Sequence, residues 1–163
     1  MEHHLQIDGW RSNVRFSSCH MLLRHDKCSR LHGHSYAVHL KVAGDLDENH
    51  MLADFGEMKK ALRDLVDELD HRTLIPTMNP DITISEDREK ESITVDMMGK
   101  VYTFPECDTI KIPVPATTVE ELSIYLMNRF LEIVELPEGV REISLGVDEG
   151  WGQGAWSTRS LRE

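Results

Sequence analysis

The sequence predicts an α+β fold in which two amphipathic helices cover one face of a four-stranded antiparallel sheet. Apolar residues recur with the helical period from Phe55 to Leu69 and again from Val119 to Ile133. They alternate with polar residues in 4–18, 35–43 and 143–148, which is typical of half-buried strands. The predicted order is β-β-α-α-β-β, with one long insert between the helices.

Capping residues mark where each helix begins. Asp54 precedes the first helix and is followed three residues later by Glu57, whereas Thr118 and Glu121 form a capping box at the start of the second. The segment 136–139, Leu-Pro-Glu-Gly, ends the second helix because it combines a proline with a glycine.

Two segments outside the helices complete the predicted fold. A last strand through Trp156 follows the glycine-rich segment 150–154. The insert, residues 77–113, shows no helical period but contains a hairpin that pairs 92–95 with 101–104. Compact domains seldom carry such long connections without a purpose, so we expect the insert to rim an active-site mouth or to join subunits.

Composition narrows the class of protein. The chain has 163 residues, enough to bury a core, and residues 1–163 are expected to form a single domain. A net charge of −11 argues against a nucleic-acid or anionic-membrane partner. No stretch approaches the roughly 20 apolar residues that span a bilayer. Three cysteines without a Cys-x-x-Cys spacing suit a reducing compartment, and the N-terminus has no leader pattern, so we expect a soluble cytoplasmic protein.

The predicted sheet also needs a partner. Two helices can cover one face of a four-stranded sheet, which leaves the other face and the edges open. Self-association is the simplest way to cover them, so the sequence predicts a homo-oligomer.

Closely spaced histidines predict a metal site. His32 and His34 point to the same side of an extended segment, about 6.5 to 7 Å apart along the chain, so both can reach one ion. His20 would supply the third ligand. Three neutral imidazoles leave one tetrahedral position open, which is the arrangement of a catalytic zinc ion rather than of a closed structural one.

A thiol lies next to these histidines. Cys28 is surrounded in sequence by Arg24, Lys27 and Arg30, and nearby cations favour a thiolate over a thiol. A structural zinc site would recruit Cys28 as its fourth ligand, whereas a catalytic site would leave the thiol free beside the metal.

These motifs resemble the 6-pyruvoyltetrahydropterin synthase and 6-carboxytetrahydropterin synthase family. The resemblance covers roughly residues 4–76 and 114–160. It rests on the segments 16–20, 28–36, 54–55, 69–71, 115–120 and 147–149. It implies the tunnelling fold, in which sheets from several subunits join into a barrel, commonly a hexamer made of two trimers with active sites between subunits.

The resemblance also implies catalytic roles. Zn²⁺ would act as a Lewis acid at the side chain of a reduced pterin. Cys28 would be the proton-abstracting base, and Asp70 with His71 would form a proton relay beside it. Asp70 and His71 are neighbours in sequence, so in a regular helix their side chains need not touch.

Three further residues are candidates for binding the pterin. Glu149 shares the strand parity of the apolar residues in 143–147, and a carboxylate on that face needs a partner. The 2-amino group and N3–H of a pterin offer two parallel donors, and the family uses a glutamate here as the pterin anchor. Thr117 and Thr118 also match pterin-contacting positions, although one of them can equally be a helix cap.

The resemblance implies an enzyme acting on 7,8-dihydroneopterin triphosphate. The segment 28–34 is most similar to the 6-carboxytetrahydropterin synthases of the 7-deazaguanine (queuosine and archaeosine) pathway, which release acetaldehyde and triphosphate. Two alternatives remain open at this point. One is a 6-pyruvoyltetrahydropterin synthase, which shares the metal and thiol set, and the other is a zinc-binding module without turnover.

Overall fold

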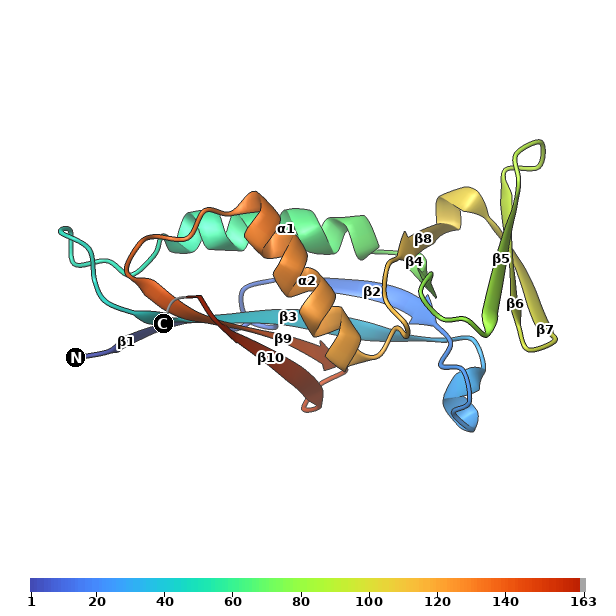
Figure 1. Cartoon of the computed structure of the whole chain (residues 1–163), viewed down its shortest axis with the longest axis horizontal. Coiled ribbons are helices and arrows are strands. Elements are labelled where there is room, and N and C mark those ends of the chain that lie inside the picture. The colour runs from blue at the N-terminus through green and yellow to red at the C-terminus, as the bar shows by residue number, and fades with distance from the viewer. Residues whose placement is uncertain (162–163) are drawn as a thin grey trace.

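The computed structural model of the protein describes residues 1–161 and shows a long sheet with both helices on one face (Figure 1). The helices are α1 (Phe55–Leu69) and α2 (Val119–Ile133). Within the described residues the sheet has seven strands: β1 (His3–Ile7), β2 (Arg15–His20), β3 (His32–Gly44), β4 (Arg72–Pro76), β8 (Thr109–Ile112), β9 (Val140–Glu149) and β10 (Gly154–Ser160). They follow the order β10-β9-β3-β2-β4-β8, and β1 pairs with β3.

The predicted antiparallel strands are present as β10-β9-β3-β2, but the prediction that residues 4–18 form one strand is wrong. The chain folds back after β1, so β1 and β2 pair with different parts of the long strand β3. Gly9 allows the close approach there, because a Cβ at this position would collide with the backbone of Val38.

The expected four-stranded sheet is also too small, because β4 and β8 extend it with parallel pairs. β4 runs parallel to β2, and β8 runs parallel to β4. Four of the five residues of β4 are buried in succession, as is usual for a parallel strand covered on both faces. Buried and exposed residues do not alternate in such a short strand, so its sequence lacks the two-residue period by which a strand is predicted.

Both helix caps are as predicted. The Asp54 side chain accepts a hydrogen bond from the Glu57 N–H at 2.9 Å, and the Thr118 side chain accepts one from the Glu121 N–H at 3.4 Å. The apolar stripes of the helices pack against the helix-facing side of β3 and β9. On β3 this side consists of Tyr36, Val38, Leu40 and Val42, all of them buried.

The opposite face of the sheet carries small, aromatic and charged residues. Trp156 of β10 lies across Gly146, where a Cβ would overlap the indole ring. Lys41 places its ammonium 4.3 Å from the centroid of the same ring, and Trp156 remains 42% exposed. No helix packs on this face within residues 1–161 (Figure 1).

Residues 82–105 form a separate small sheet, which we call the excursion. It contains β5 (Ile82–Asp87), β6 (Ser92–Met97) and β7 (Lys100–Pro105), and β6 pairs with both neighbours in antiparallel fashion. The predicted hairpin of β6 and β7 is confirmed. After the short 3-10 helix η2 (Glu106–Asp108) the chain returns to the main sheet as β8. Neither described helix is long and apolar enough to cross a membrane.

Candidate active site

Three histidines meet where β2 ends and β3 begins. His20 is the last residue of β2 and lies opposite His32 in the antiparallel register, and His34 follows two positions later on β3. One ring nitrogen from each of the three lies within 4.8 Å of the other two. The predicted proximity of these side chains is therefore confirmed, and they can hold a metal ion.

Backbone carbonyls orient two of the rings. His20 Nδ1 donates a hydrogen bond to the carbonyl of Thr117 at 2.9 Å, and His32 Nδ1 donates one to the carbonyl of Arg30 at 2.6 Å. A carbonyl can only accept, so both rings carry their proton on Nδ1 and keep the Nε2 lone pair free. Metal-binding histidines are commonly held in this way.

The donor set fits a metal ion. The Nε2 atoms of His20, His32 and His34 are buried. Those of His20 and His32 have no hydrogen-bond partner within the described part of the chain, and His34 Nε2 has the Glu149 carboxylate 3.0 Å away. Burial lowers the pKa of His20 to about 4 and also lowers the pKa of His34. The imidazoles of His20 and His34 are therefore neutral at physiological pH, which is the form that coordinates a metal. A buried nitrogen without a partner is costly, and an ion bound to the three rings would remove that cost at His20 and His32.

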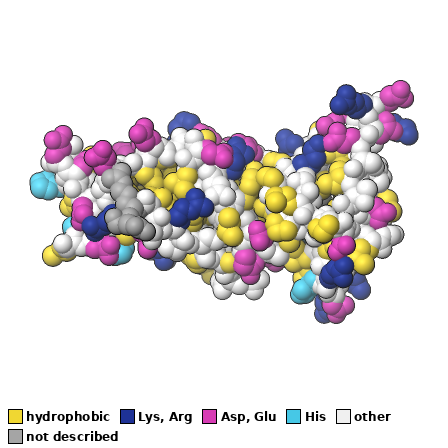
Figure 2. Space-filling view, viewed as in Figure 1, with side chains coloured by type: hydrophobic (Ala, Val, Ile, Leu, Met, Phe, Trp, Pro, Cys, Tyr) yellow, Lys and Arg dark blue, Asp and Glu magenta, His cyan; other side chains and the backbone are white. Residues whose placement is uncertain are grey.

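Cys28 lies outside this cluster. It belongs to the 3-10 helix η1 (Lys27–Ser29), in the loop between β2 and β3, and is half-buried. Among the described residues, the group that can hold a metal consists of the three histidines and does not include this thiol. Figure 2 shows Lys and Arg side chains gathered where the loop projects from the molecule. The loop is therefore locally basic in a chain of net charge −11.

The Asp70 and His71 side chains do touch. The helix ends at Leu69, and His71 adopts a positive φ of 58°, which turns its ring back toward the carboxylate. His71 Nδ1 donates to Asp70 at 2.8 Å, and the Ser17 N–H donates to the other carboxylate oxygen at 2.7 Å. Partial burial opposes ionisation of Asp70, but the hydrogen bonds from Ser17 and His71 outweigh it and hold the pKa of Asp70 below its ordinary value.

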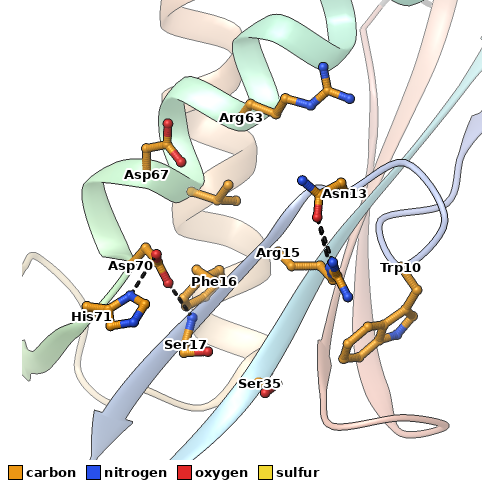
Figure 3. Close-up of a pocket in the computed structure, with 11 residues that line it drawn as sticks. Trp10, Asn13, Arg15, Phe16, Ser17, Ser35, Arg63, Asp67, Asp70 and His71 are labelled. Atoms are coloured by element: carbon orange, nitrogen blue, oxygen red, sulfur yellow. Dashed lines mark hydrogen bonds and ion pairs between the residues drawn. The ribbon is translucent and has the colours of Figure 1, made fainter.

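This pair lines a hollow of about 570 Å³ between α1 and β2 (Figure 3). An adjoining hollow is lined by His71 together with His34 of the histidine cluster. Cys28 lines neither of the two. Neither of these two hollows therefore brings the thiol and the Asp70–His71 pair together.

Glu149 lies beside the histidines. It ends β9, pairs with Tyr36 in the register, and shares the helix-facing side with Val147, as its parity predicts. One carboxylate oxygen lies 3.0 Å from His34 Nε2, and the side chain is 20% exposed. The carboxylate therefore has a basic neighbour and still reaches the surface.

Thr117 and Thr118 have structural contacts of their own. Thr117 is fully buried, and both its carbonyl and its hydroxyl lie within hydrogen-bonding distance of His20 Nδ1. Thr118 caps α2 through its side chain. Contact of either threonine with a pterin stays a prediction.

A family model described as 6-pyruvoyl tetrahydropterin synthase matches residues 10–158. The chain belongs to this family. The family consists of lyases, so the chain is an enzyme of that class.

Curated relatives extend the similarity to most of the chain. A Methanocaldococcus jannaschii protein with the provisional name 6-carboxy-5,6,7,8-tetrahydropterin synthase is 34% identical over 154 residues, which is 93% of this chain and 93% of the relative. The 6-carboxy-5,6,7,8-tetrahydropterin synthase of Haemophilus influenzae is 29% identical over 120 residues, or 70% of this chain and 75% of the relative.

Solved structures of the 6-pyruvoyl tetrahydropterin synthase family share the fold. The 6-pyruvoyltetrahydropterin synthase of Plasmodium vivax superposes with a TM-score of 0.90 at 24% identity, covering 99% of both chains. The predicted tunnelling fold is therefore confirmed for the single chain, with a larger mixed sheet than expected.

Sequence reasoning assigned no role to Tyr36. Its ring stacks on Phe16 at 4.6 Å and stands edge-on to His20 and His34. Its buried hydroxyl has no hydrogen-bond partner within residues 1–161, and burial raises its pKa, so it stays protonated. Tyr36 is separated from His32 and His34 by an even number of residues on the same strand, so all three side chains lie on one face. This spacing is the sequence signal that places Tyr36 beside the histidine cluster.

Proposed function

We propose that the protein converts 7,8-dihydroneopterin triphosphate to 6-carboxy-5,6,7,8-tetrahydropterin, with release of acetaldehyde and triphosphate, as a step of the 7-deazaguanine pathway in the cytoplasm. The observation that carries the proposal is the set of three imidazoles, with buried Nε2 atoms, that can hold a metal while the nearby thiol stays outside it. This is the donor set of an open, catalytic zinc site. The names of the curated relatives support the same reaction.

We propose zinc as the metal, held by His20, His32 and His34. When bound, it would supply a Lewis acid beside the side-chain oxygens of the substrate. The carbonyls of Thr117 and Arg30 would keep two of the rings oriented for it.

Cys28 is the proposed base that abstracts a proton from the pterin side chain. Its loop presents cationic residues on both sides of it, and cations favour the thiolate that such a base requires. Its position outside the histidine cluster supports a free thiol rather than a fourth ligand.

Asp70 and His71 are the proposed proton relay, completed between subunits. The carboxylate fixes the ring through Nδ1, which leaves Nε2 of a strongly exposed imidazole to give or take a proton. Cys28 lies in neither hollow that His71 lines, so we infer that the relay serves the thiol of a neighbouring copy. The open face of the sheet supports such assembly, and a hexamer of two trimers built from this single domain is the form we propose.

The relay predicts a large effect for Asp70→Asn. The amide can still accept from the Ser17 N–H, but it no longer holds His71 in one tautomer, so kcat should fall roughly 10²- to 10⁴-fold. Steady-state kinetics on the triphosphate substrate measure this. Asp67→Asn is the matched control, because Asp67 lies one turn earlier on α1 and lines the same hollow. Equal kcat values for both variants would contradict the relay.

Glu149 is the proposed pterin anchor, and Glu149→Gln tests it. Glutamine keeps the size but offers a donor where the pterin edge also donates, so binding should weaken by roughly ten- to a hundredfold. Titration of a reduced pterin measures the loss, and the zinc content should not change. Glu142→Gln, an exposed position on the same strand, is the control. Unaltered pterin binding in a folded Glu149→Gln protein would place the anchor elsewhere.

Product analysis tests the function itself. The purified protein is incubated with 7,8-dihydroneopterin triphosphate, and the pterin product is identified by mass. A 6-carboxy product with equimolar acetaldehyde is the expected result. A 6-pyruvoyl product would assign the alternative synthase reaction, and unchanged substrate in the presence of zinc-loaded protein would favour the module without turnover.

A further inference from the structure

The loop that carries Cys28, residues 21–31, has three contacts with the excursion or with Asp81, the residue just before it. Met21 packs in an apolar cluster with residues of the excursion, and Leu23 packs against this cluster; its buried members are Met21, Ile75, Ile93, Val95 and Met97. Arg24 forms an ion pair with Asp81 at 2.7 Å, just before β5. Lys100, the first residue of β7, donates from its ammonium to the carbonyl of Ser29 at 2.8 Å.

The third of these contacts lies next to the thiol. Ser29 directly follows Cys28, and its own N–H donates to the His25 carbonyl at 2.9 Å. The Leu22 N–H donates to the carbonyl of Cys28 at 2.8 Å. The backbone on both sides of the thiol is therefore held, and Lys100 is the excursion residue that reaches it.

The backbone that carries Lys100 has a defined geometry. It follows the tight turn between β6 and β7, where Met98 and Gly99 both have positive φ and the Gly99 N–H donates to Asp96 at 2.7 Å. Its ammonium also lies 5.6 Å from the centroid of the Tyr102 ring. A turn with defined geometry presents the ammonium in one place, so less side-chain entropy opposes the contact with Ser29.

We propose that the excursion holds the thiol loop in its working position, with Lys100 as the positioning residue. The proposal rests on the proposed function, in which Cys28 is the base. A base must lie within hydrogen-bonding reach of the proton that it abstracts, and a small misplacement of such a group lowers the rate strongly. The contact also places a cation one residue from the thiol.

The test compares Lys100→Met with Lys90→Met. Lys90 is an exposed lysine in the turn between β5 and β6, where it pairs with Asp87 and does not reach the thiol loop. In Lys100→Met we expect amide exchange at Leu22 and Ser29 to rise about tenfold and kcat to fall about tenfold, as for loss of one charge-assisted hydrogen bond. The KM and the zinc content should stay unchanged. Lys100→Arg should restore most of both losses, because a guanidinium can donate to the same carbonyl.

Each outcome decides the proposal. Unchanged exchange in Lys100→Met, an equal change in Lys90→Met, or faster exchange with full kcat would each overturn it. If the wild-type protein does not turn over the pterin triphosphate, the proposed function fails, and the exchange measurement still decides whether Lys100 holds the loop.

Discussion

Replacing His32 with alanine should remove the metal and the activity together. His32 supplies one of three buried Nε2 atoms that converge on one point, and two imidazoles alone cannot complete the site. Replacing residues that only hydrogen-bond to zinc ligands already lowers affinity or activity about 10- to 100-fold. Loss of a ligand itself should therefore lower both by more than about a hundredfold. Elemental analysis and turnover of the same preparation measure both effects.

His4→Ala is the control for this substitution. His4 lies on β1 with 68% of its side chain exposed, and it is not part of the histidine cluster. It should leave zinc content and rate unchanged. Full activity in a metal-free His32→Ala protein would show that the reaction does not use this site.

Replacing Cys28 with alanine should have a comparable effect on rate and none on zinc. The thiol lies outside the histidine cluster, so its loss removes the proposed base but leaves the three imidazoles in place. Turnover should fall by roughly 10²- to 10⁴-fold, the range expected for one proton-transferring group. Zinc content, oligomeric state and turnover are measured on one preparation.

Cys107 provides the matched control. Cys107 is exposed and lies in neither hollow of the candidate site, whereas Cys19 of β2 lines the hollow shared by His34 and His71. Cys107→Ala should leave the rate nearly unchanged. Loss of zinc in Cys28→Ala would instead support a structural site in which this thiol is the fourth ligand.

Local signals were enough to predict the helices and the proximity of His32 and His34. The cap of α1 depends on Asp54 and the residues just after it, and the convergence of His32 and His34 follows from their spacing on one strand. His20 joins them because the β2–β3 loop returns the chain to the same end of the sheet.

Contacts between distant segments could not be predicted from such signals. β4 and β8 are short and form parallel pairs whose partners lie far away in sequence, so nothing local marks them as strands. The contact of His71 with Asp70 depends on one positive φ just beyond the helix. Lys100 and Ser29 are 71 residues apart, and their contact exists because the excursion folds back over the loop.

The pairing of His20 with His32 gives the metal a second consequence. These residues face each other at the two ends of the loop 21–31, so an ion bound to both would act as a clasp at the base of that loop. The excursion holds the middle of the loop through Lys100, and the bound ion would hold its two ends where they join the sheet. Chelation should therefore expose 21–31 to proteases before the sheet itself unfolds, and cleavage there would serve as a gauge of metal occupancy that needs no substrate.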